Sequence, residues 1–228
     1  MCGRYSLVTS VEKIQQQLGE AIMLPPELPL NYNIAPTQQS LVLTNQAPDR
    51  LQVYRWGLVP HWSKDTQHAA RLINARREHI ATKPSFRIPI RKRRCLVLAD
   101  SFYEWRKEGG QKIPYRFRLA NEELLLFAGI WDIWQQENGQ SLHTYSIITT
   151  DPNREMEGIH NRMPVILSHP EQQGKWLADV ELDEALELLQ TPPDGILQFY
   201  RVSQRVTSVR NNGPALHEPV SDEPLTLF

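Results

Sequence analysis

A repeated strand-turn-strand pattern constrains the fold of this chain more than any other feature. Residues 124–130 are almost entirely apolar, residues 142–150 are rich in β-branched side chains, and Asn138-Gly139 lies between them. An Asn-Gly pair tolerates the positive φ angles of a tight hairpin turn, so the two stretches are predicted to pair as strands. Gly109-Gly110 similarly precedes the alternating stretch 115–119. The sequence therefore predicts two β-hairpins.

Other short segments have strand-like or helix-like spacing. Thr9 to Glu12 has the form of a capping box, and apolar residues then recur at helical spacing until Gly19. Residues 31–36 are predicted to be an ordered loop, and residues 72–80 a loop that enters a short helix with Asn74 near its cap. Further predicted strands are residues 41–43, 51–56, 95–99, 165–167 and 200–203, and further predicted helices are residues 171–177 and 182–189.

Length and composition favour one domain over residues 1–228, with a mobile tail from about residue 215. The sequence shows no apolar run long enough to span a bilayer and no secretory signal, so we expect a cytoplasmic protein. The only cysteines are Cys2 and Cys95, and Cys95 opens an apolar run typical of the core. The seven histidines lack paired ligand spacing, so the sequence predicts no metal site.

The charge is unevenly distributed along the chain. Residues 1–120 hold 19 Lys and Arg against 9 Asp and Glu, whereas residues 121–228 hold 6 against 17, although the net charge is only −1. A basic half can form a face that binds a polyanion. Alternatively, the two halves interleave in the fold and neutralise each other. The basic run 91–94 has the same two interpretations, either a solvated strand edge or a phosphate contact.

The first residues carry a specific chemical signal. A small residue at position 2 normally allows removal of the initiator methionine, so the mature chain is expected to begin at Cys2. A terminal cysteine has an amine and a thiol with ordinary pKa values of about 7.7–8.0 and about 8.5, so each is partly nucleophilic near neutral pH. An aldehyde can form an imine with the amine and then a thiazolidine with the thiol. The plainer interpretation is a small buried residue that starts a strand.

Three internal residues have both a structural and a functional interpretation. Glu104 lies between two aromatic residues after a predicted buried strand, where desolvation would raise its pKa, but alternation alone also permits an exposed position. His160 precedes a predicted strand, and a single histidine is more often structural than catalytic. Trp62 follows Pro60 among polar neighbours, where it either packs or stacks on a nucleic-acid base.

Seven short motifs follow one another along nearly the whole chain. They are Cys2-Gly3-Arg4, Tyr32 to Pro36, Trp56-Gly57-Leu58, Ile73 to Arg76, Phe102 to Trp105, Ile159 to Pro164 and Val209 to Asn212. Taken together and in this order, they resemble the SRAP family, the SOS-response-associated peptidases or abasic-site-processing proteins. The resemblance implies an α+β fold in a single domain with a barrel-like, mainly antiparallel sheet flanked by short helices.

The resemblance also implies a function in DNA damage and a role for each matched residue. A protein of this family recognises abasic sites in single-stranded DNA and joins them covalently through Cys2 as a thiazolidine, without a cofactor. Catalytic roles fall on Cys2, Asn74, Glu104 and His160, and DNA contacts on Arg4, Asn33, Trp62, Arg76, Thr149 and Arg162. We expect a monomer that acts at the nucleoid. Trp62 is followed by Ser63, whereas some bacterial relatives have two adjacent tryptophans, so the contact with flanking duplex is expected to differ.

Three other functions remain open from the residues. A cysteine peptidase or amidohydrolase would use Cys2 as nucleophile, His160 as base, and Glu104 or Asn74 to orient it. It would need the thiol but not the free amine, and self-catalysed removal of Met1 would reconcile this activity with DNA crosslinking. A noncovalent DNA reader would bind without Cys2 in a salt-sensitive way. A Schiff-base lyase would cut the strand, because an imine at C1′ acidifies the protons at C2′.

Overall fold

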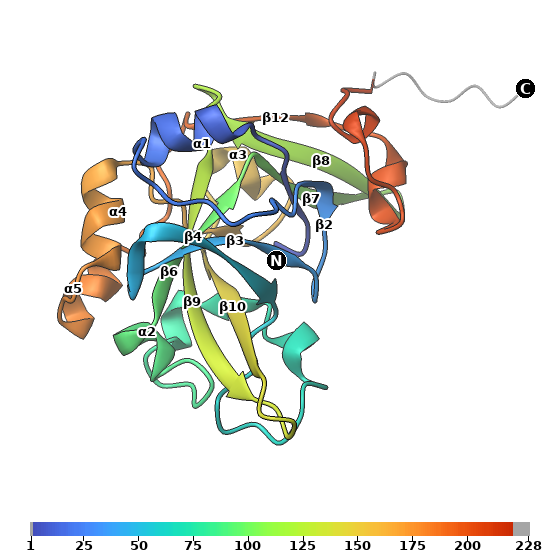
Figure 1. Cartoon of the computed structure of the whole chain (residues 1–228). Helices are drawn as coiled ribbons and strands as arrows, with labels where there is room; N and C mark the ends of the chain where they lie inside the picture. Colours follow the sequence, from blue (N-terminus) through green and yellow to red (C-terminus); the bar gives the residue numbers. More distant parts are fainter. Residues whose placement is uncertain (1, 221–228) are drawn as a thin grey trace, which may run out of the picture.

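The computed structural model describes residues 2–220 and shows an α+β fold with two β-sheets and a few short helices (Figure 1). One sheet closes into a barrel, and the other lies against it and contains the first strand of the chain. The predicted fold class is confirmed.

The barrel is made of five strands that pair in a ring. Their order is β10-β4-β3-β6-β9, and β9 pairs again with β10 to close the circle. The β4 and β10 pair is parallel and the other four are antiparallel. The strands are β3 (Gln39–Thr44), β4 (Ala47–Trp56), β6 (Arg94–Ala99), β9 (Leu125–Gln135) and β10 (Ser141–Thr150).

Two very short strands extend the barrel at β10. β5 (Asn74–Arg76) runs parallel to β10, and β11 (Met163–Pro164) runs antiparallel to it. Because the parallel register pairs Asn74 with Ile147 and Arg76 with Thr149, these four side chains share one face of the sheet. Three of these four residues, Asn74 and Arg76 on β5 and Thr149 on β10, are assigned to the functional site by the sequence.

The second sheet has five antiparallel strands in the order β12-β8-β7-β1-β2. Its inner strand β1 joins the two sheets, because Tyr5 packs edge-on against Trp56 of β4 and Phe127 of β9. The N-terminus thus begins at the seam between the sheets. The strands are β1 (Tyr5–Leu7), β2 (Asn31–Ile34), β7 (Ser101–Glu108), β8 (Gln111–Leu119) and β12 (Leu197–Arg201).

The helices are short and lie at the periphery (Figure 1). Each has one or two buried side chains, so the sheets supply most of the core. The α-helices are α1 (Val11–Leu18), α2 (Pro89–Lys92), α3 (Arg154–Glu157), α4 (Pro170–Leu177) and α5 (Leu182–Glu187), and the 3-10 turns are η1 (Ala69–Arg71), η2 (Arg77–His79), η3 (Gln204–Thr207) and η4 (Pro214–Leu216).

Both predicted hairpins are present. β9 and β10 pair across the turn that contains Asn138-Gly139, and β7 and β8 pair across Gly109-Gly110. These glycines have φ values of 81°, 54° and 81°, respectively, which explains why the turns need them. The predicted core position of Cys95 is also confirmed, since its side chain is fully buried.

Several local predictions are wrong. The predicted loop 31–36 begins with strand β2, and Asn74 is a residue of β5 and caps no helix. The cap of α1 is Ser10, because the Thr9 hydroxyl donates to Asp100 instead. The predicted strand 165–167 is displaced to β11, with only Ile166 forming an isolated bridge.

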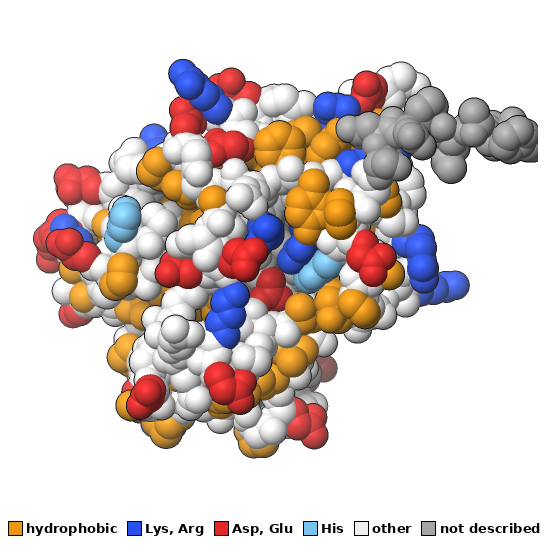
Figure 2. Space-filling model, turned by 90° about the horizontal axis from the view of Figure 1, so that it is seen from above, with side chains coloured by type: hydrophobic (Ala, Val, Ile, Leu, Met, Phe, Trp, Pro, Cys, Tyr) orange, Lys and Arg blue, Asp and Glu red, His pale blue; other side chains and the backbone are white. Residues whose placement is uncertain are grey.

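The charged segments also differ from expectation. Arg94, predicted on a solvated edge or a phosphate contact, is fully buried and donates to the carbonyls of Ile90, Arg91, Trp176 and Ala178. Acidic side chains gather over α4 and α5 at one end of the molecule (Figure 2). No helix within residues 2–220 has both the length and the apolar character required to cross a membrane.

The C-terminal segment is packed further than predicted. The sequence predicts a mobile tail from about residue 215, but Leu216 is buried with Tyr103, Val202 and Val206. Val202 also forms a β-bridge with Pro219. The rest of the predicted tail, residues 221–228, lies outside the described residues.

Candidate functional site

Cys2 is held at the seam between the two sheets. Its side chain is fully buried, and its carbonyl accepts a hydrogen bond of 2.7 Å from Nδ2 of Asn74. Burial, with the nearby Glu104 carboxylate adding to it, raises the pKa of the Cys2 thiol well above its usual range. Asn74 is itself buried, and its Oδ1 has no hydrogen-bond partner within the described residues. Asn74 therefore fixes the backbone at Cys2 and retains an acceptor.

Glu104 faces the interior of the site. It lies on β7 and is 3% exposed, which decides the question that alternation left open. Burial raises the pKa of the Glu104 carboxyl to about 7. A carboxyl with this pKa populates both protonation states near neutral pH, so it can donate or accept a proton.

His160 lies in the loop between α3 and β11, and the backbone fixes its ring. The N–H of Arg162 donates to His160 Nδ1 over 3.0 Å, so the neutral ring carries its proton on Nε2. Burial lowers the pKa of the half-buried imidazole, and the charge of Lys107 lowers it further. The Arg162 carbonyl lies 3.2 Å from the same nitrogen, where it can accept a hydrogen bond from Nδ1–H when the ring becomes charged.

Glu104 and His160 line one pocket of about 340 Å³. Arg4 also lines this pocket. The structure therefore brings together three predicted site residues that are far apart in the sequence. Four lining residues were not predicted as site residues, namely Trp105, Lys107, Lys112 and Thr207. The hairpin turn at 109–110 could have placed the two lysines opposite each other, whereas nothing in the sequence indicates the position of Thr207.

Arg4 is oriented by Asn33 and by the segment 206–211. Its guanidinium donates to Asn33 Oδ1 over 2.7 Å and to the carbonyl of Val206 over 2.8 Å. The Asn33 amide in turn donates to the carbonyls of Ser208 and Asn211. Asn33, predicted to contact DNA, is only 1% exposed, so the structure places it as an internal brace and not on a DNA-facing surface.

Arg162 is buried in an ion-pair network. Its guanidinium contacts both carboxylate oxygens of Glu78, at 2.8 and 2.9 Å, and Asp151 at 2.8 Å. It also donates to the carbonyl of Thr149. Since two carboxylates already engage this side chain, the structure does not present it to a DNA phosphate. Its visible effect is to hold the backbone that orients His160.

The remaining predicted residues lie on the surface or at the sheet edge. Arg76 is exposed on β5, and Thr149 is fully buried on the same face, with no hydrogen-bond partner for its hydroxyl within residues 2–220. Trp62 lies in the loop after β4 and is 56% exposed. Trp62 is not among the residues that line the pocket with Glu104 and His160.

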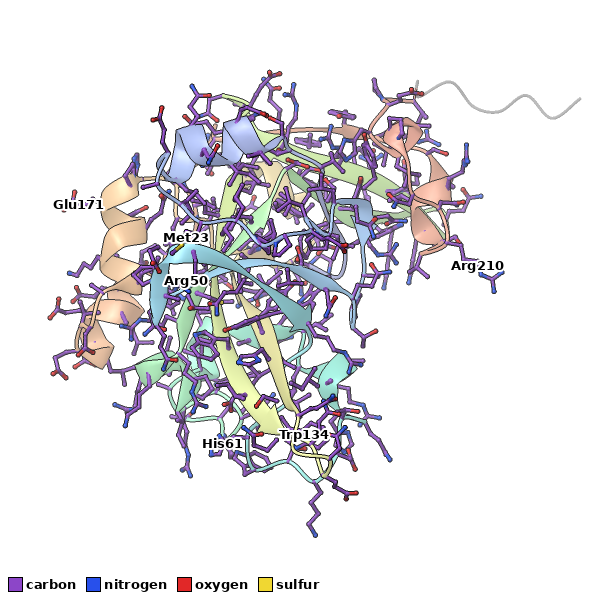
Figure 3. All side chains as sticks on the ribbon, viewed as in Figure 1. Met23, Arg50, His61, Trp134, Glu171 and Arg210 are labelled. Carbon is purple, nitrogen blue, oxygen red and sulfur yellow. The ribbon has the colours of Figure 1, made fainter. Side chains whose placement is uncertain are left out.

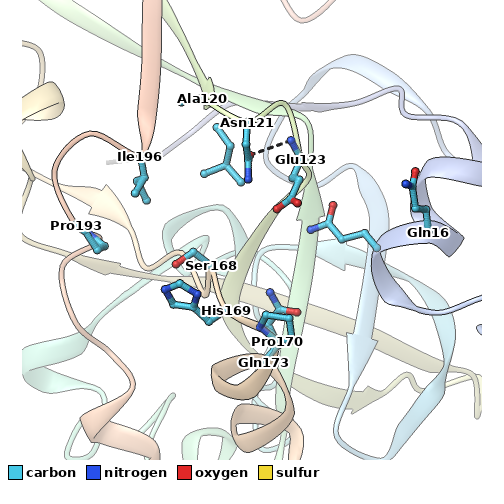
Figure 4. Close-up of a pocket in the computed structure, with 12 residues that line it drawn as sticks. Gln16, Ala120, Asn121, Glu123, Ser168, His169, Pro170, Gln173, Pro193 and Ile196 are labelled. Atoms are coloured by element: carbon cyan, nitrogen blue, oxygen red, sulfur yellow. Dashed lines mark hydrogen bonds between the residues drawn. The ribbon is translucent and has the colours of Figure 1, made fainter.

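A larger hollow of about 640 Å³ lies elsewhere, between α1, the β8-β9 connection and the start of α4 (Figure 4). Its lining is mainly amide and apolar side chains and includes none of the predicted site residues. Within the part of the chain that the structure describes, no group of His, Cys, Asp and Glu has the arrangement of a metal site.

A family model described as SOS response associated peptidase (SRAP) matches residues 1–209. The chain belongs to this family. It is 42% identical over 223 residues to the abasic site processing protein YoqW of Bacillus subtilis, with 96% of this chain and 99% of YoqW covered. It is 36% identical to the abasic site processing protein HMCES of Mus musculus, with 83% of this chain and 65% of HMCES covered.

A solved structure gives the same fold. The crystal structure of a protein from Bacteroides thetaiotaomicron superposes with a TM-score of 0.87 at 29% sequence identity, covering 96% of this chain and 100% of that chain. The closed barrel and the second sheet are therefore an arrangement that this SRAP-family chain shares with a solved protein.

Proposed function

We propose that this chain, once Met1 is removed, reacts with abasic sites in single-stranded DNA and remains attached through Cys2. The observation that carries the proposal is the position of Cys2 beside a buried carboxyl whose pKa is about 7. The names of its relatives, abasic site processing proteins, support the same substrate. Such a crosslink would shield the lesion.

The proposed reaction has two bond-forming steps. The ring-opened abasic sugar presents an aldehyde at C1′, and the Cys2 amine adds to it and loses water to give a Schiff base. The thiol of Cys2 then loses its proton, its sulfur adds to C1′, and the imine nitrogen takes up a proton to complete the thiazolidine. Both steps use only the amine and thiol of Cys2 with proton donors and acceptors from the protein, so no cofactor is needed.

Each neighbouring residue has a defined task in this reaction. The Glu104 carboxyl exchanges protons with the sugar oxygen and the carbinolamine, and His160 donates through Nε2–H. Asn74 holds the backbone of Cys2 in place. Arg4, Arg76, Lys107 and Lys112 attract the phosphates, Trp62 contacts a base, and Thr149 lies beside the lesion. We expect a monomeric cytoplasmic protein acting at the nucleoid.

The test is a denaturing gel of the Met1-processed protein with a single-stranded oligonucleotide that holds one abasic site. We expect a shifted band that requires the abasic site and is lost in Cys2→Ala and Cys2→Ser. If Cys2→Ser cuts the strand, its amine still forms the imine, and the thiol is what suppresses elimination. Cys95→Ala is the matched control, because Cys95 is equally buried but lies in the barrel core. No shifted band with the unmodified protein would contradict the proposal.

A second activity, self-catalysed removal of Met1, is favoured by the burial of Cys2, because a separate peptidase would need access to the bond before it. The test is to synthesise the chain in a system that lacks methionine aminopeptidase and to follow its intact mass. We expect the unmodified chain to lose Met1 and Cys2→Ala to keep it. Equal retention of Met1 in both chains would exclude self-processing. Turnover on unrelated peptides, lost with the thiol but not on acetylation of the amine, would instead favour a general peptidase.

A further inference from the structure

The loop that carries Trp62 is attached to the β9-β10 hairpin by three side chains. Thr144 Oγ1 accepts from the N–H of Val59 over 2.9 Å, and Asp132 Oδ2 accepts from the N–H of His61 over 3.0 Å. Trp134 Nε1 donates to the carbonyl of Ser63 over 2.7 Å. The hairpin therefore holds a backbone group of every second residue from 59 to 63. Figure 3 labels His61 and Trp134 at the end of the molecule where this hairpin turns.

The three side chains lie on one face of the hairpin. Asp132 and Trp134 are two residues apart on β9, so they point the same way. Thr144 is the direct partner of Asp132 on β10, so it shares that face. Thr144 Oγ1 also lies 3.4 Å from the carbonyl of Asp132, which it can reach as a donor. Strand periodicity thus places the three anchors in a row, which we call the hairpin brace.

Asp132 is the strongest anchor of the hairpin brace. Its carboxylate is fully buried, and it also accepts from Nδ1 of His61 at 3.0 Å and from the guanidinium of Arg93. A buried carboxylate needs several charge-assisted hydrogen bonds to offset its loss of water. The carboxylate is therefore committed to fixing both the backbone and the ring of His61, directly before Trp62.

Trp62 is the residue that the hairpin brace leaves outside. Its ring is 56% exposed, although its neighbours on both sides have backbone groups bonded to the hairpin. An exposed tryptophan on an anchored backbone loses little conformational entropy when a flat ligand stacks on it. The arrangement suits a nucleic-acid base, since base stacking on an aromatic ring is worth about 1–3 kcal/mol and tolerates any sequence.

We propose that Asp132, Thr144 and Trp134 are positioning residues. They hold the loop 59–63 in one conformation, in which the exposed Trp62 ring can stack on a base of bound DNA. The inference rests on the proposed function, in which Trp62 contacts a base of the bound strand. The hairpin brace acts on binding and not on the chemistry at Cys2. Its loss should therefore raise the DNA concentration that gives half-maximal crosslinking and leave the maximal rate unchanged.

Two conservative variants test the proposal. Thr144→Val keeps the shape but removes the acceptor for Val59, and Trp134→Phe keeps an aromatic ring but removes the donor to Ser63. Each is measured alone and combined with Trp62→Ala, by fluorescence anisotropy with an oligonucleotide whose tetrahydrofuran abasic analogue cannot form an aldehyde. Thermal melting confirms that each variant folds. Trp176→Phe is the matched control, because it removes a similar indole bond, 2.9 Å to the Cys95 carbonyl, at a remote site.

The expected effect is a loss of affinity of about three- to tenfold for each brace variant, the equivalent of one hydrogen bond. In the Trp62→Ala background the same changes should have less than about a twofold effect, because coupled residues are not additive. The control variant should bind like the unmodified protein. Unchanged affinity of the brace variants, or equal losses with and without Trp62, would overturn the inference.

The two proposals fail in different ways. If the unmodified protein binds the tetrahydrofuran oligonucleotide but forms no crosslink with a natural abasic site, the reaction is wrong, and the binding assay still decides the role of the hairpin brace. If the unmodified protein crosslinks normally and the brace variants need the same DNA concentration for half-maximal crosslinking, only the proposed role of the hairpin brace is wrong. Absence of any DNA binding would contradict both.

Discussion

Glu104 shows how one buried carboxyl links the site to the stability of the fold. Burial raises its pKa from an ordinary 4.5 to about 7, so between these pH values the folded state binds more protons than the unfolded state. The free energy of unfolding therefore falls as pH rises through this window and levels off above it. At pH 8 the ionised carboxyl costs the folded protein on the order of 3 kcal/mol, since the pKa rises by about 2.5 units and each unit is worth about 1.4 kcal/mol.

Glu104→Gln should remove this cost because a neutral amide does not ionise. We expect the variant to exceed the unmodified protein in unfolding free energy by about 3 kcal/mol at pH 8 and to match it near pH 4. Urea unfolding at both pH values measures the difference. Glu108→Gln, on the exposed end of the same strand, is the control and should show no such pH dependence. An equal effect of Glu104→Gln at pH 4 and pH 8 would mean that the carboxyl is not perturbed.

The β7-β8 hairpin brings two positive charges to the rim of the reaction pocket. Lys107 and Lys112 are directly opposite in the register, and like charges at such positions destabilise a sheet. Both line the pocket beside Arg4, where a phosphate of a bound strand would relieve the repulsion. The double variant Lys107→Ala with Lys112→Ala should lower the magnitude of the slope of log affinity against log salt. The expected decrease is roughly 0.7 if one phosphate contact is lost and roughly 1.4 if two are lost.

The salt dependence is measured by anisotropy with single-stranded DNA over a range of potassium chloride concentrations. Lys175→Ala is the control for lost charge, because Lys175 lies on α4, where it pairs with Glu184. This control should leave the slope as it is. A double lysine variant with an unaltered slope would show that the hairpin does not contact the phosphates.

The two hairpins show which elements of this fold can be predicted from the sequence. Their turns and alternation are local signals, so the pairing across Gly109-Gly110 and Asn138-Gly139 was predictable. β5 was not, because its three residues become a strand only through β10, which follows about 70 residues later. The burial of Arg94 is not evident from the sequence for a similar reason, since the four carbonyls that accept its hydrogen bonds come from two separate helical regions. Motif chemistry predicts roles for Cys2, Glu104 and His160, but only the fold shows how far each side chain is buried.

At the scale of the whole molecule, residues near the N-terminus and residues 206–211 together form one side of the pocket. Asn33 links them, because it accepts from Arg4 near the N-terminus and donates to the carbonyls of Ser208 and Asn211 near the C-terminus. The C-terminal segment also supplies the Val206 carbonyl to Arg4. Because Thr207 of the same segment lines the pocket, residues 206–211 are a structural part of it.

Asn33→Ala should loosen both ends of the chain at once. It removes hydrogen bonds to the partly buried carbonyls of Ser208 and Asn211 and to the Arg4 guanidinium. Each bond is worth about 0.5–1.5 kcal/mol, so we expect a loss of about 2–4 kcal/mol in unfolding free energy. Crosslinking should also slow, because Arg4 and the 205–212 segment would no longer be held. Urea unfolding and limited proteolysis after Arg205 and Arg210 measure the two effects. Asn138→Ala, at an exposed turn, is the control. Faster proteolysis without slower crosslinking would show that the segment stabilises the fold but does not shape the site.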